Sequence, residues 1–332
     1  MRTITVGKNE EGQRLDRILI RLLPNAGKGF IFKMLRKKNI VLNGKKAEGS
    51  ERLKPGDEIK LFFSEESFEK FTGKKTDPDN VNDVYTKPLD DITDMIVYED
   101  EDVIILNKPK GVLSQKAEKD DISLNEMLTA HMLHKGEINE EQMATFKPAM
   151  CNRLDRNTSG LICGGKTLKG LRGLSELFRS RELDKYYLCI VKGKVEKQQR
   201  IEGYLVKDES SNKVSVRPFL DKDNVEGEES KGSKIVTEYK PVAYGEDSTL
   251  LEVKLITGKS HQIRAHLASI GHPLAGDVKY GDTKYNRKVL DAHKISSQVL
   301  MAYRMVFPKD CGELTRLSGK EIKLDKPEEF FI

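Results

Sequence analysis

The first 63 residues alternate short apolar runs with basic segments in an order that predicts two helices followed by short strands. Residues 15–23 (LDRILIRLL) carry apolar side chains at helical spacing, and residues 30–38 (FIFKMLRKK) predict a second helix that ends in a basic cluster. Residues 39–45 predict a strand that turns at Asn43-Gly44, a dipeptide typical of tight hairpin turns. Residues 52–63 predict a further turn and strand. A small N-terminal domain is therefore expected.

Residues 64–94 interrupt this pattern. They are polar, lack apolar periodicity and contain Pro78 and Pro88, a composition typical of a linker. We therefore expect three parts: a head of residues 1–63, an acidic flexible linker of residues 64–94, and a body of residues 95–332.

The body has a denser apolar pattern. Residues 96–109 predict a strand, an acidic turn and a buried strand that stops at a proline, and Ser123 and Glu126 form a capping box that begins a helix. Further strands are predicted at residues 186–191, 235–239, 249–256 and 300–307, and short helices at residues 171–178 and 262–270. Strands in runs, with helices between them but no regular βαβ alternation, favour an α+β body with a mixed, largely antiparallel sheet.

Charge is distributed unevenly over these parts. The chain has a net charge of +5, but the head contains 15 Lys and Arg against 7 Asp and Glu, and the linker contains 4 basic against 9 acidic residues. A basic head beside an acidic linker suggests that the head meets a polyanion, although a solvated basic surface has the same composition. Charge alone does not choose between the two interpretations.

Composition excludes several classes of protein. No run approaches the roughly 18–20 apolar residues of a membrane span, and the N-terminal residues lack the apolar stretch of a signal peptide. The four cysteines show no C-x-x-C spacing, so neither a zinc knuckle nor a disulfide framework is indicated. The sequence therefore predicts a cytoplasmic protein that does not associate with a membrane.

Gly160 to Thr167 fit the G-x-x-x-x-G-K-T pattern of a phosphate-binding P-loop. A P-loop needs a glycine-rich turn between a strand and a helix, because its backbone N–H groups must wrap around phosphates. The four variable positions, residues 161–164, resemble the interior of a strand instead, and no apolar strand ending in a magnesium-binding Asp accompanies them. We therefore interpret this segment as a strand rather than as a nucleotide site.

The same residues belong to a longer motif. Residues 153–166, RLDRNTSGLICGGK, resemble the R-L-D-x-x-T-S-G-L-x-x-x-x-K signature of the RluA/RluC/RluD family of pseudouridine synthases. Residues 98–111, 185–193 and 258–277 resemble three further motifs of this family, in the family's order. One position departs from the pattern: Asn152 stands where the family usually has His, at a position not expected to take part in the chemistry.

The head resembles a different known module, the small S4-type RNA-binding domain. The segments that carry this resemblance are GQRLD at residues 12–16, RKKNIVLNGKK at residues 36–46 and LKPGDEI at residues 53–59. The resemblance implies that the head binds RNA. The RNA contacts expected there are Arg36, Lys37 and Lys38.

The resemblance of the body implies that the protein isomerises a uridine within RNA to pseudouridine. In this reaction the N-glycosidic bond breaks, the uracil rotates and a C-glycosidic bond forms to carbon five of the base. Because neither a redox change nor a transfer to another molecule occurs, the resemblance implies no cofactor and no metal. It also implies that Asp155 is catalytic. The carboxylate could attack the anomeric carbon or carbon six of uracil, or stabilise a glycal-forming route, and the sequence does not choose.

By the same resemblance, two residues act with Asp155. Arg264 matches the family arginine that pairs with this aspartate, and a guanidinium suits a carboxylate. Tyr187, rather than Tyr186, fits the spacing of the pocket tyrosine, whose ring stacks on uracil and whose hydroxyl could move a sugar proton. Lys166 is expected near the site, at the end of the catalytic strand. The further substrate- or RNA-binding residues implied are Arg153, His261, Gln262 and Ile263.

Several histidines raise the question of a metal site. His261, His266 and His272 lie close in sequence, but no acidic or thiol partner recurs at a ligand spacing, so structural or RNA-contacting roles are expected. His131 and His134 lie on a short amphipathic helix and are expected at the surface.

Two other functions fit the sequence less well than a pseudouridine synthase. An RNA-binding protein that has lost catalysis would be expected to lack one of Asp155, Tyr187 and Arg264. A glycosidase would require two carboxylates across the scissile bond. Within the family, the head most resembles the RluC type, which favours structured large-subunit ribosomal RNA as the substrate, with transfer RNA as the alternative. The protein is expected to be a monomer. Specificity is expected in residues 113–148 and 207–233, which do not reveal the target nucleotides.

Overall fold

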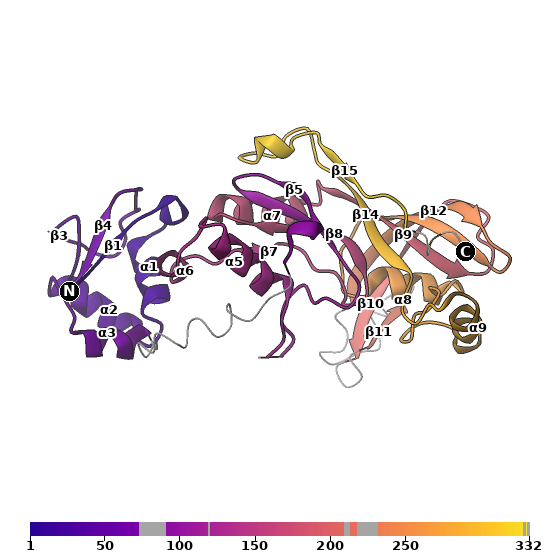
Figure 1. Cartoon of the computed structure of the whole chain (residues 1–332), viewed down its shortest axis with the longest axis horizontal. Helices are drawn as coiled ribbons and strands as arrows, with labels where there is room; N and C mark the ends of the chain where they lie inside the picture. The colour runs from indigo at the N-terminus through magenta and orange to yellow at the C-terminus, as the bar shows by residue number, and fades with distance from the viewer. Residues whose placement is uncertain (73–90, 119, 209–212, 218–231, 328–329, 331–332) are drawn as a thin grey trace, which may run out of the picture.

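The described residues form a 4-stranded β-sheet in the head and an 11-stranded β-sheet in the body. The computed structural model describes residues 1–72, 91–118, 120–208, 213–217, 232–327 and 330. The molecule is elongated, with the head and the N-terminus at one end and α9 (Thr283–His293) towards the other (Figure 1).

The head confirms the predicted helices and strands. Its elements are β1 (Arg2–Thr5), η1 (Lys8–Glu10), α1 (Leu15–Leu22), α2 (Lys28–Arg36), β2 (Ile40–Leu42), β3 (Lys45–Lys46) and β4 (Glu58–Leu61). Asn43 and Gly44 both have positive φ, 51° and 72°, as the tight turn between β2 and β3 requires. The sequence pattern did not reveal β1, which is only four residues long and pairs with β4 at an edge of the sheet.

The first part of the expected linker is a helix, which corrects the sequence prediction. Residues Glu65–Thr72 form α3, and Phe68 is buried in the hydrophobic core of the head. The ring of Phe71 lies 4.5 Å from the ring of Phe30 in α2. Phe68 and Phe71 stand three residues apart, so one helix face turns both towards the head. Residues 73–90 of the expected linker lie outside the described residues.

The body contains the predicted mixed, largely antiparallel sheet. Its strands are β5 (Ile96–Glu99), β6 (Val103–Lys108), β7 (Ala149–Met150), β8 (Ser159–Gly165), β9 (Asp184–Lys192), β10 (Gln199–Asp208), β11 (Lys213–Arg217), β12 (Ser233–Tyr244), β13 (Ser248–Leu255), β14 (Leu300–Val306) and β15 (Glu321–Lys323). The main path is β11-β10-β12-β13-β9-β14-β8-β6-β5, and β7 and β15 pair with β8 and β14. Among the described strand pairs of this sheet, β14–β8 is parallel and the others are antiparallel.

Helices cover both faces of this sheet. The helical elements of the body are η2 (Thr93–Met95), α5 (Leu124–His134), α6 (Glu140–Met143), α7 (Leu168–Ser180), α8 (Gln262–Ser269), α9 and η4 (Thr315–Leu317). Side chains of α5 and α8 share one hydrophobic core with alternate residues of β6, β8 and β9. The intervening residues of these strands face α7 or α9. The period-two alternation of each central strand therefore builds two apolar faces.

Helix α5 is more deeply buried than its sequence indicates. His131 was expected at the surface, but the structure leaves only 9% of it exposed. Seven consecutive positions from Leu128 to His134 include five buried ones, because α5 packs between the sheet and the segment around Ile92. The helix is therefore not amphipathic in the expected sense.

One row of the sheet gathers the strands that carry the site. Lys108 of β6 pairs with Gly160 of β8, Gly160 pairs with Ala302 of β14, and Ala302 pairs with Tyr187 of β9. Gly160 has a φ of +107°, and a Cβ atom there would lie 2.1 Å from the carbonyl oxygen of Ala302. Only glycine allows these two strands to approach each other so closely.

Candidate active site

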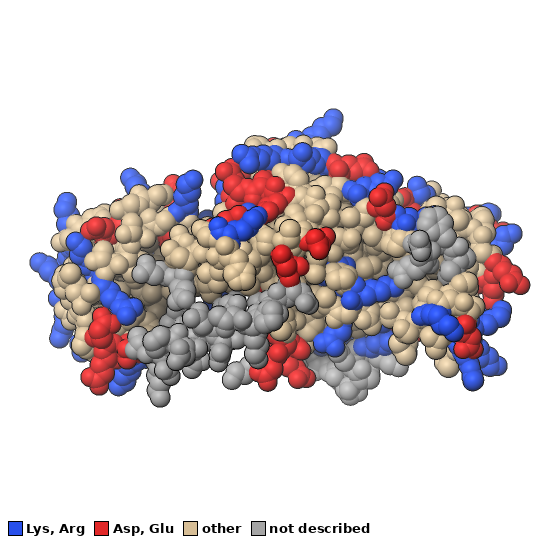
Figure 2. Space-filling view, viewed as in Figure 1, with Lys and Arg blue, Asp and Glu red and all other residues tan. Residues whose placement is uncertain are grey.

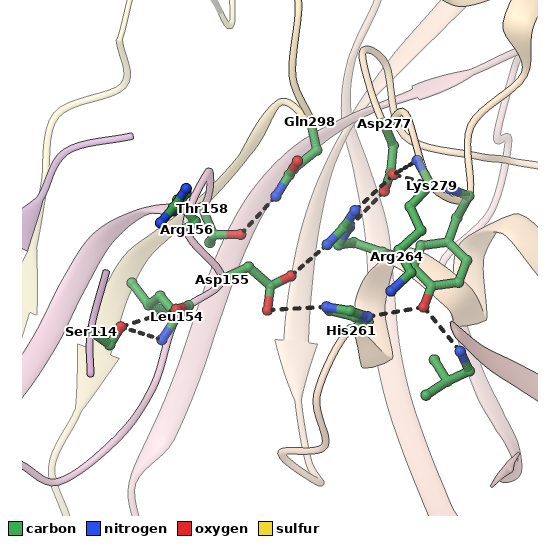
Figure 3. Close-up of polar contacts among 12 residues, drawn as sticks. Ser114, Leu154, Asp155, Arg156, Thr158, His261, Arg264, Asp277, Lys279 and Gln298 are labelled. Atoms are coloured by element: carbon green, nitrogen blue, oxygen red, sulfur yellow. Dashed lines mark hydrogen bonds and ion pairs between the residues drawn. The ribbon is translucent and has the colours of Figure 1, made fainter. Parts of the chain in front are cut away.

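The loop before β8 is fixed on both sides of Asp155. The backbone N–H of Thr158 donates to the Asp155 carbonyl at 3.0 Å, which closes a turn. On the other side, Ser114 Oγ donates to the Leu154 carbonyl at 3.0 Å and accepts from the Leu154 N–H at 3.1 Å (Figure 3). Because these bonds hold its neighbours, the backbone of Asp155 occupies one defined position.

A fully buried lysine forms hydrogen bonds to the same loop. Lys108 Nζ donates to the carbonyls of Pro109, Val112 and Arg156 at 3.0, 2.8 and 2.9 Å. Burial lowers the pKa of Lys108 to about 8, and the nearby Asp155 carboxylate opposes this shift, so the ammonium remains charged at pH 7. Lys108 thus ties the residue after Asp155 to the end of β6.

Arg264 of α8 lies between two carboxylates (Figure 3). Its Nη1 donates to Asp155 Oδ2 at 2.8 Å, while its Nε and Nη2 donate to the two oxygens of Asp277 at 2.7 and 2.8 Å. The side chains of Asp277, Arg264 and Asp155 are 0%, 9% and 25% exposed. The buried bidentate pair therefore fixes the guanidinium, which in turn holds the more exposed Asp155 carboxylate.

The turn that carries Asp277 stabilises its negative charge. Asp277 Oδ1 also accepts the backbone N–H groups of Lys279 and Tyr280, at 2.9 and 3.0 Å. Burial alone would raise the pKa of Asp277, but the bonds and charge of Arg264 and these two N–H groups lower it overall. Asp277 is therefore ionised at neutral pH and serves as a permanent anchor for Arg264.

His261 approaches the other oxygen of Asp155. Its Nε2 lies 3.9 Å from Asp155 Oδ1, and its Nδ1 lies 2.9 Å from the hydroxyl of Tyr280. The guanidinium of Arg264 lies over the ring of Tyr280, 5.2 Å from its centre. The backbone N–H of Val214 in β11 donates to the Tyr280 hydroxyl at 3.1 Å. These contacts join α8, the turn after Asp277 and β11 around Asp155.

An apolar wall adjoins this polar cluster. Tyr187 and Ile263 are 6% and 4% exposed and belong to the same hydrophobic core. Burial raises the pKa of Tyr187, and the negative charge of Asp155 raises it further, so the hydroxyl is neutral at physiological pH. Among the described residues this hydroxyl has no hydrogen-bond partner. A neutral aromatic side chain beside a carboxylate suits a site for a planar, uncharged base.

The other predicted site residues differ in burial and in their distance from the Asp155 cluster. Gln262 is 2% exposed, and its amide bonds to Val236, Thr237, Thr257 and Lys259, so it fastens α8 to β12. Arg153 is exposed beside Asp155. Arg36, Lys37 and Lys38 are exposed on the head, outside the Asp155 cluster.

Lys166 lies away from Asp155, contrary to the expectation that it stands near the site. It follows the last residue of β8, whereas Asp155 precedes the first, so the length of the strand separates them. Its buried ammonium pairs with Glu99 at 2.6 Å and Glu137 at 2.8 Å. Lys166 therefore holds the far end of the strand in place. Residues 161–164 lie inside β8, which confirms that this segment is a strand rather than the turn of a P-loop.

Sequence reasoning did not single out several residues of the cluster. Asp277 stood inside a recognised motif, but nothing in the motif assigned it to Arg264. Lys108 could have been noticed as a charged residue at the end of a strand that begins with four apolar residues. Tyr280 gave no signal, because its partners come from α8 and β11. Asn152, the departure from the family pattern, accepts the backbone N–H of Cys163 at 2.8 Å and so has a structural contact.

The described part of the chain contains no group of three or more His, Cys, Asp and Glu side chains arranged to hold a metal ion. His266 is buried and bonds to Thr237, and His272 bonds to the carbonyl of Lys192. None of the helices in the described ranges has the length and apolar character required to cross a bilayer.

Comparison with known sequences places the cluster in context. The sequence model of the family described as RNA pseudouridylate synthase matches residues 102–269, which include Asp155, Tyr187 and Arg264. The chain is 32% identical to "Ribosomal large subunit pseudouridine synthase C" of Rickettsia bellii, over 94% of this chain and 93% of the relative. It is 31% identical to "Uncharacterized RNA pseudouridine synthase MG370" of Mycoplasma genitalium, over 92% of this chain and 88% of the relative.

Solved structures agree at the level of the fold. The structure of human RNA pseudouridylate synthase domain containing 4 matches with a TM-score of 0.56 at 22% identity, over 72% of this chain and 91% of that one. The structure of human RNA pseudouridylate synthase domain containing 1 matches with a TM-score of 0.51 at 19% identity, over 70% of this chain and 82% of that one.

Proposed function

The chain belongs to the RNA pseudouridylate synthase family, and we propose that it converts one or more uridines of large-subunit ribosomal RNA to pseudouridine. As a member of this family it is an isomerase that acts on uridine already within RNA. The support for the ribosomal target is that several relatives, from Rickettsia and Vibrio species, carry the name of a large-subunit ribosomal pseudouridine synthase over more than four fifths of this chain.

The reaction demands little besides a carboxylate and a closed pocket. The bond between the sugar and N1 of uracil breaks, and a bond between the same sugar carbon and C5 of uracil forms. C5 loses a proton and N1 gains one, so the product has the composition of the substrate. The protein must therefore hold the base while it is detached, position a charged group at the sugar or the base, and move a proton.

The contact between Arg264 and Asp155 carries the assignment of the active site. Arg264 bonds to Asp155 and directs the carboxylate, because the buried Asp277 prevents the guanidinium from moving. Asp155 is the most exposed member of this chain of charges, so it is the one that a substrate reaches. We assign it the role of nucleophile or charge stabiliser.

Tyr187 and Ile263 supply the wall of the pocket, where uracil stacks while the glycosidic bond is open. The hydroxyl of Tyr187 is neutral, and in this proposal it gives a proton to the sugar or takes one from it. The ammonium group of Lys108 donates to three backbone carbonyls and does not face the pocket. We therefore assign Lys108 the role of fixing the loop of Asp155.

The head supplies a second RNA contact in this proposal. Its fold of two helices and a small sheet is the arrangement expected of an S4-type domain, and Arg36, Lys37 and Lys38 are exposed at the end of α2. Lys and Arg side chains project from the head over the face seen in Figure 2. Phosphate contacts of this kind position RNA without reading its sequence. We propose that the protein acts as a monomer, and a ribosomal substrate implies a cytoplasmic location.

The test is complementation of a strain that lacks this gene. Pseudouridines are mapped in ribosomal and transfer RNA from the deletion strain, and from strains that express the wild-type protein, Asp155→Asn or Asp310→Asn. Asp310 is an exposed carboxylate outside the cluster and serves as the matched control. We expect at least one pseudouridine of large-subunit RNA to vanish on deletion and to return with the wild type and Asp310→Asn, but not with Asp155→Asn.

Purified Asp155→Asn is expected to bind the same RNA within a few-fold of the wild type, because affinity rests on phosphate contacts rather than on one carboxylate. Recovery of the modification with Asp155→Asn would refute the catalytic role of Asp155. Loss of a pseudouridine from transfer RNA alone would refute the ribosomal target and leave the chemistry intact.

A further inference from the structure

His261 makes contacts that a simple RNA-binding residue would not need. Its ring is held between Tyr280 on one side and Asp155 on the other, at 2.9 Å from the Tyr280 hydroxyl and 3.9 Å from Asp155 Oδ1. Its backbone adopts the left-handed conformation, with φ 56° and ψ 14°, immediately before α8. Histidine, like asparagine and aspartate, adopts this conformation more readily than most residues other than glycine, so the backbone places the ring there at small energetic cost.

Hydrogen-bond directions determine which ring nitrogen carries the proton. The backbone N–H of Val214 can only donate, so the Tyr280 oxygen accepts from it. Within the described ranges, His261 Nδ1 is the one acceptor in reach of the Tyr280 hydroxyl proton. The arrangement that satisfies all of these groups has Tyr280 donating to Nδ1, which leaves the proton of a neutral His261 on Nε2. That N–H is the group that faces Asp155.

Burial is the main reason that the ring of His261 stays neutral. Burial lowers the pKa of His261, the charge of Asp155 opposes this, and the charges of Arg264 and Lys279 lower it further. At pH 7 the ring therefore carries a single proton. The donor that it offers to Asp155 is a neutral N–H, which does not compete with the guanidinium for the charge of the carboxylate.

We propose that His261 is a positioning residue for Asp155, holding the carboxylate oxygen that Arg264 leaves free, with its tautomer fixed by Tyr280. Arg264 donates to Oδ2 and His261 Nε2–H faces Oδ1, so the two residues define the orientation of the carboxylate plane. The separation of 3.9 Å is about 1 Å longer than a hydrogen bond, and it closes when Asp155 turns towards its substrate. This inference rests on the proposed function, because it concerns the same carboxylate.

The network also links the site to β11. Val214 lies in the antiparallel hairpin of β10 and β11, and its N–H sets the direction of the Tyr280 hydroxyl. In this network the backbone of β11 donates to Tyr280, Tyr280 donates to His261, and the Nε2–H of His261 faces Asp155. Residues of one strand of this hairpin thus influence the carboxylate without touching it.

Two substitutions of His261 separate positioning from structural support. The amide nitrogen of His261→Gln reaches the place of Nε2, whereas the amide of His261→Asn reaches only the place of Nδ1. We expect kcat to fall about ten-fold or more in His261→Asn and to stay within about three-fold in His261→Gln, with KM within two-fold in both. Asparagine tolerates the left-handed backbone better than glutamine, so His261→Asn should be at least as stable. Activity and stability therefore rank the two variants in opposite orders.

Tyr280→Phe provides a second variant, because it removes the hydroxyl and keeps the ring beneath Arg264. It is expected to lower kcat by about five-fold and to leave KM unchanged. The tautomer is measured directly from the nitrogen resonances of the imidazole in protein labelled with ¹⁵N histidine, with His261 identified by its absence from His261→Asn. Protonated Nε2 is expected in the wild type, and a mixture of the two tautomers in Tyr280→Phe.

A wild-type ring protonated on Nδ1 would overturn the inference, and so would a raised KM with an unchanged kcat, which would make His261 an RNA contact. The tautomer measurement needs no RNA. It therefore tests the arrangement of His261 independently, even if the wild-type protein should prove to form no pseudouridine, which would refute the proposed function instead.

Discussion

Burial decides which ionisable side chains of the body carry charge. Asp277 is completely buried and yet ionised, because Arg264 and two backbone N–H groups compensate it. His266 lies two residues after Arg264 in α8 and is 2% exposed. Within the described ranges, no charged partner compensates the cost of burying it in the charged form. Its Nδ1 bonds to the hydroxyl of Thr237, and burial lowers its pKa to about 4 despite a hydrogen bond to the backbone of Glu202. The same helix thus contains a buried charge that is paired and a buried histidine that stays neutral.

The neutral state of His266 predicts an acid-sensitive fold. Above pH 6.5 the residue is neutral in both the folded and the unfolded chain. Between pH 6.5 and about 4 the unfolded chain binds a proton that the folded chain refuses, so the free energy of unfolding decreases as the pH falls. Urea unfolding at a series of pH values should show the wild type losing about 2–3 kcal/mol more than His266→Gln between pH 7 and 4.5. Parallel pH profiles for the two proteins would show that His266 is not the group responsible.

At the scale of elements, β8 is the strand on which the site depends. It receives β14 in parallel and β6 in antiparallel register, and its first residues bring the loop of Asp155 next to Lys108 and Tyr187. The close approach at Gly160 makes this arrangement possible, since a side chain there would meet the backbone of Ala302. The apolar residues inside β8 are ordinary core residues. Gly160, in contrast, is required, because a side chain at this position would collide with β14.

Replacement of Gly160 by alanine tests this requirement. Gly319 has a φ of +69° and no atom within 4 Å of the place of a Cβ, so it serves as the control for backbone strain alone. Gly319→Ala should cost about 1 kcal/mol, whereas Gly160→Ala should cost at least about 3–4 kcal/mol, because β8 and β14 must separate. Both values follow from denaturant unfolding. Similar losses in the two variants would mean that the strands can adjust to the added methyl group.

At the scale of the whole molecule, the head is joined to the body by a buried polar contact. Glu10 accepts the hydroxyl of Thr145 at 2.5 Å, and Arg21 donates to the Thr145 carbonyl at 2.9 Å. Asn9 accepts the backbone N–H of Leu168 at 3.1 Å, at the start of α7. Glu10 and Thr145 are 5% and 4% exposed. The head is thus held at a fixed place relative to β8 and α7, and an RNA that touches both must match that separation.

A charge at the joint should release the head. Thr145→Asp places a second carboxylate against buried Glu10, whereas Thr145→Ser keeps the hydroxyl. Small-angle scattering should show a larger radius of gyration for Thr145→Asp and an unchanged one for Thr145→Ser. We expect KM for a structured RNA to rise in Thr145→Asp by about ten-fold, with kcat within two-fold, because the Asp155 cluster is untouched. An unchanged scattering curve in Thr145→Asp would show that the joint does not hold the head.

The sequence by itself determined the local structure and the family. Helix α1, the Asn43-Gly44 turn and strands β5, β6, β9, β12, β13 and β14 follow from apolar periodicity and turn residues, which act over a few positions. The sequence did not predict strands β7, β10, β11 and β15. The resemblance to a known family implied that Asp155, Arg264 and Tyr187 act together, and the structure pairs Arg264 with Asp155. The motifs carry this resemblance because each keeps its own residues close along the chain, but the motifs themselves are far apart in sequence.

Only the tertiary structure decided which distant side chains meet. Asp277 bonds to Arg264, Tyr280 to His261 and Lys108 to the carbonyl of Arg156 across different elements. Lys166 has a motif position beside Asp155 in sequence, but β8 is extended, and about 3.3 Å per residue carries it to the opposite end. Helix α3 gained its stability from aromatic contacts with the head rather than from its own polar sequence. Contacts between elements depend on register and packing, which no local pattern encodes.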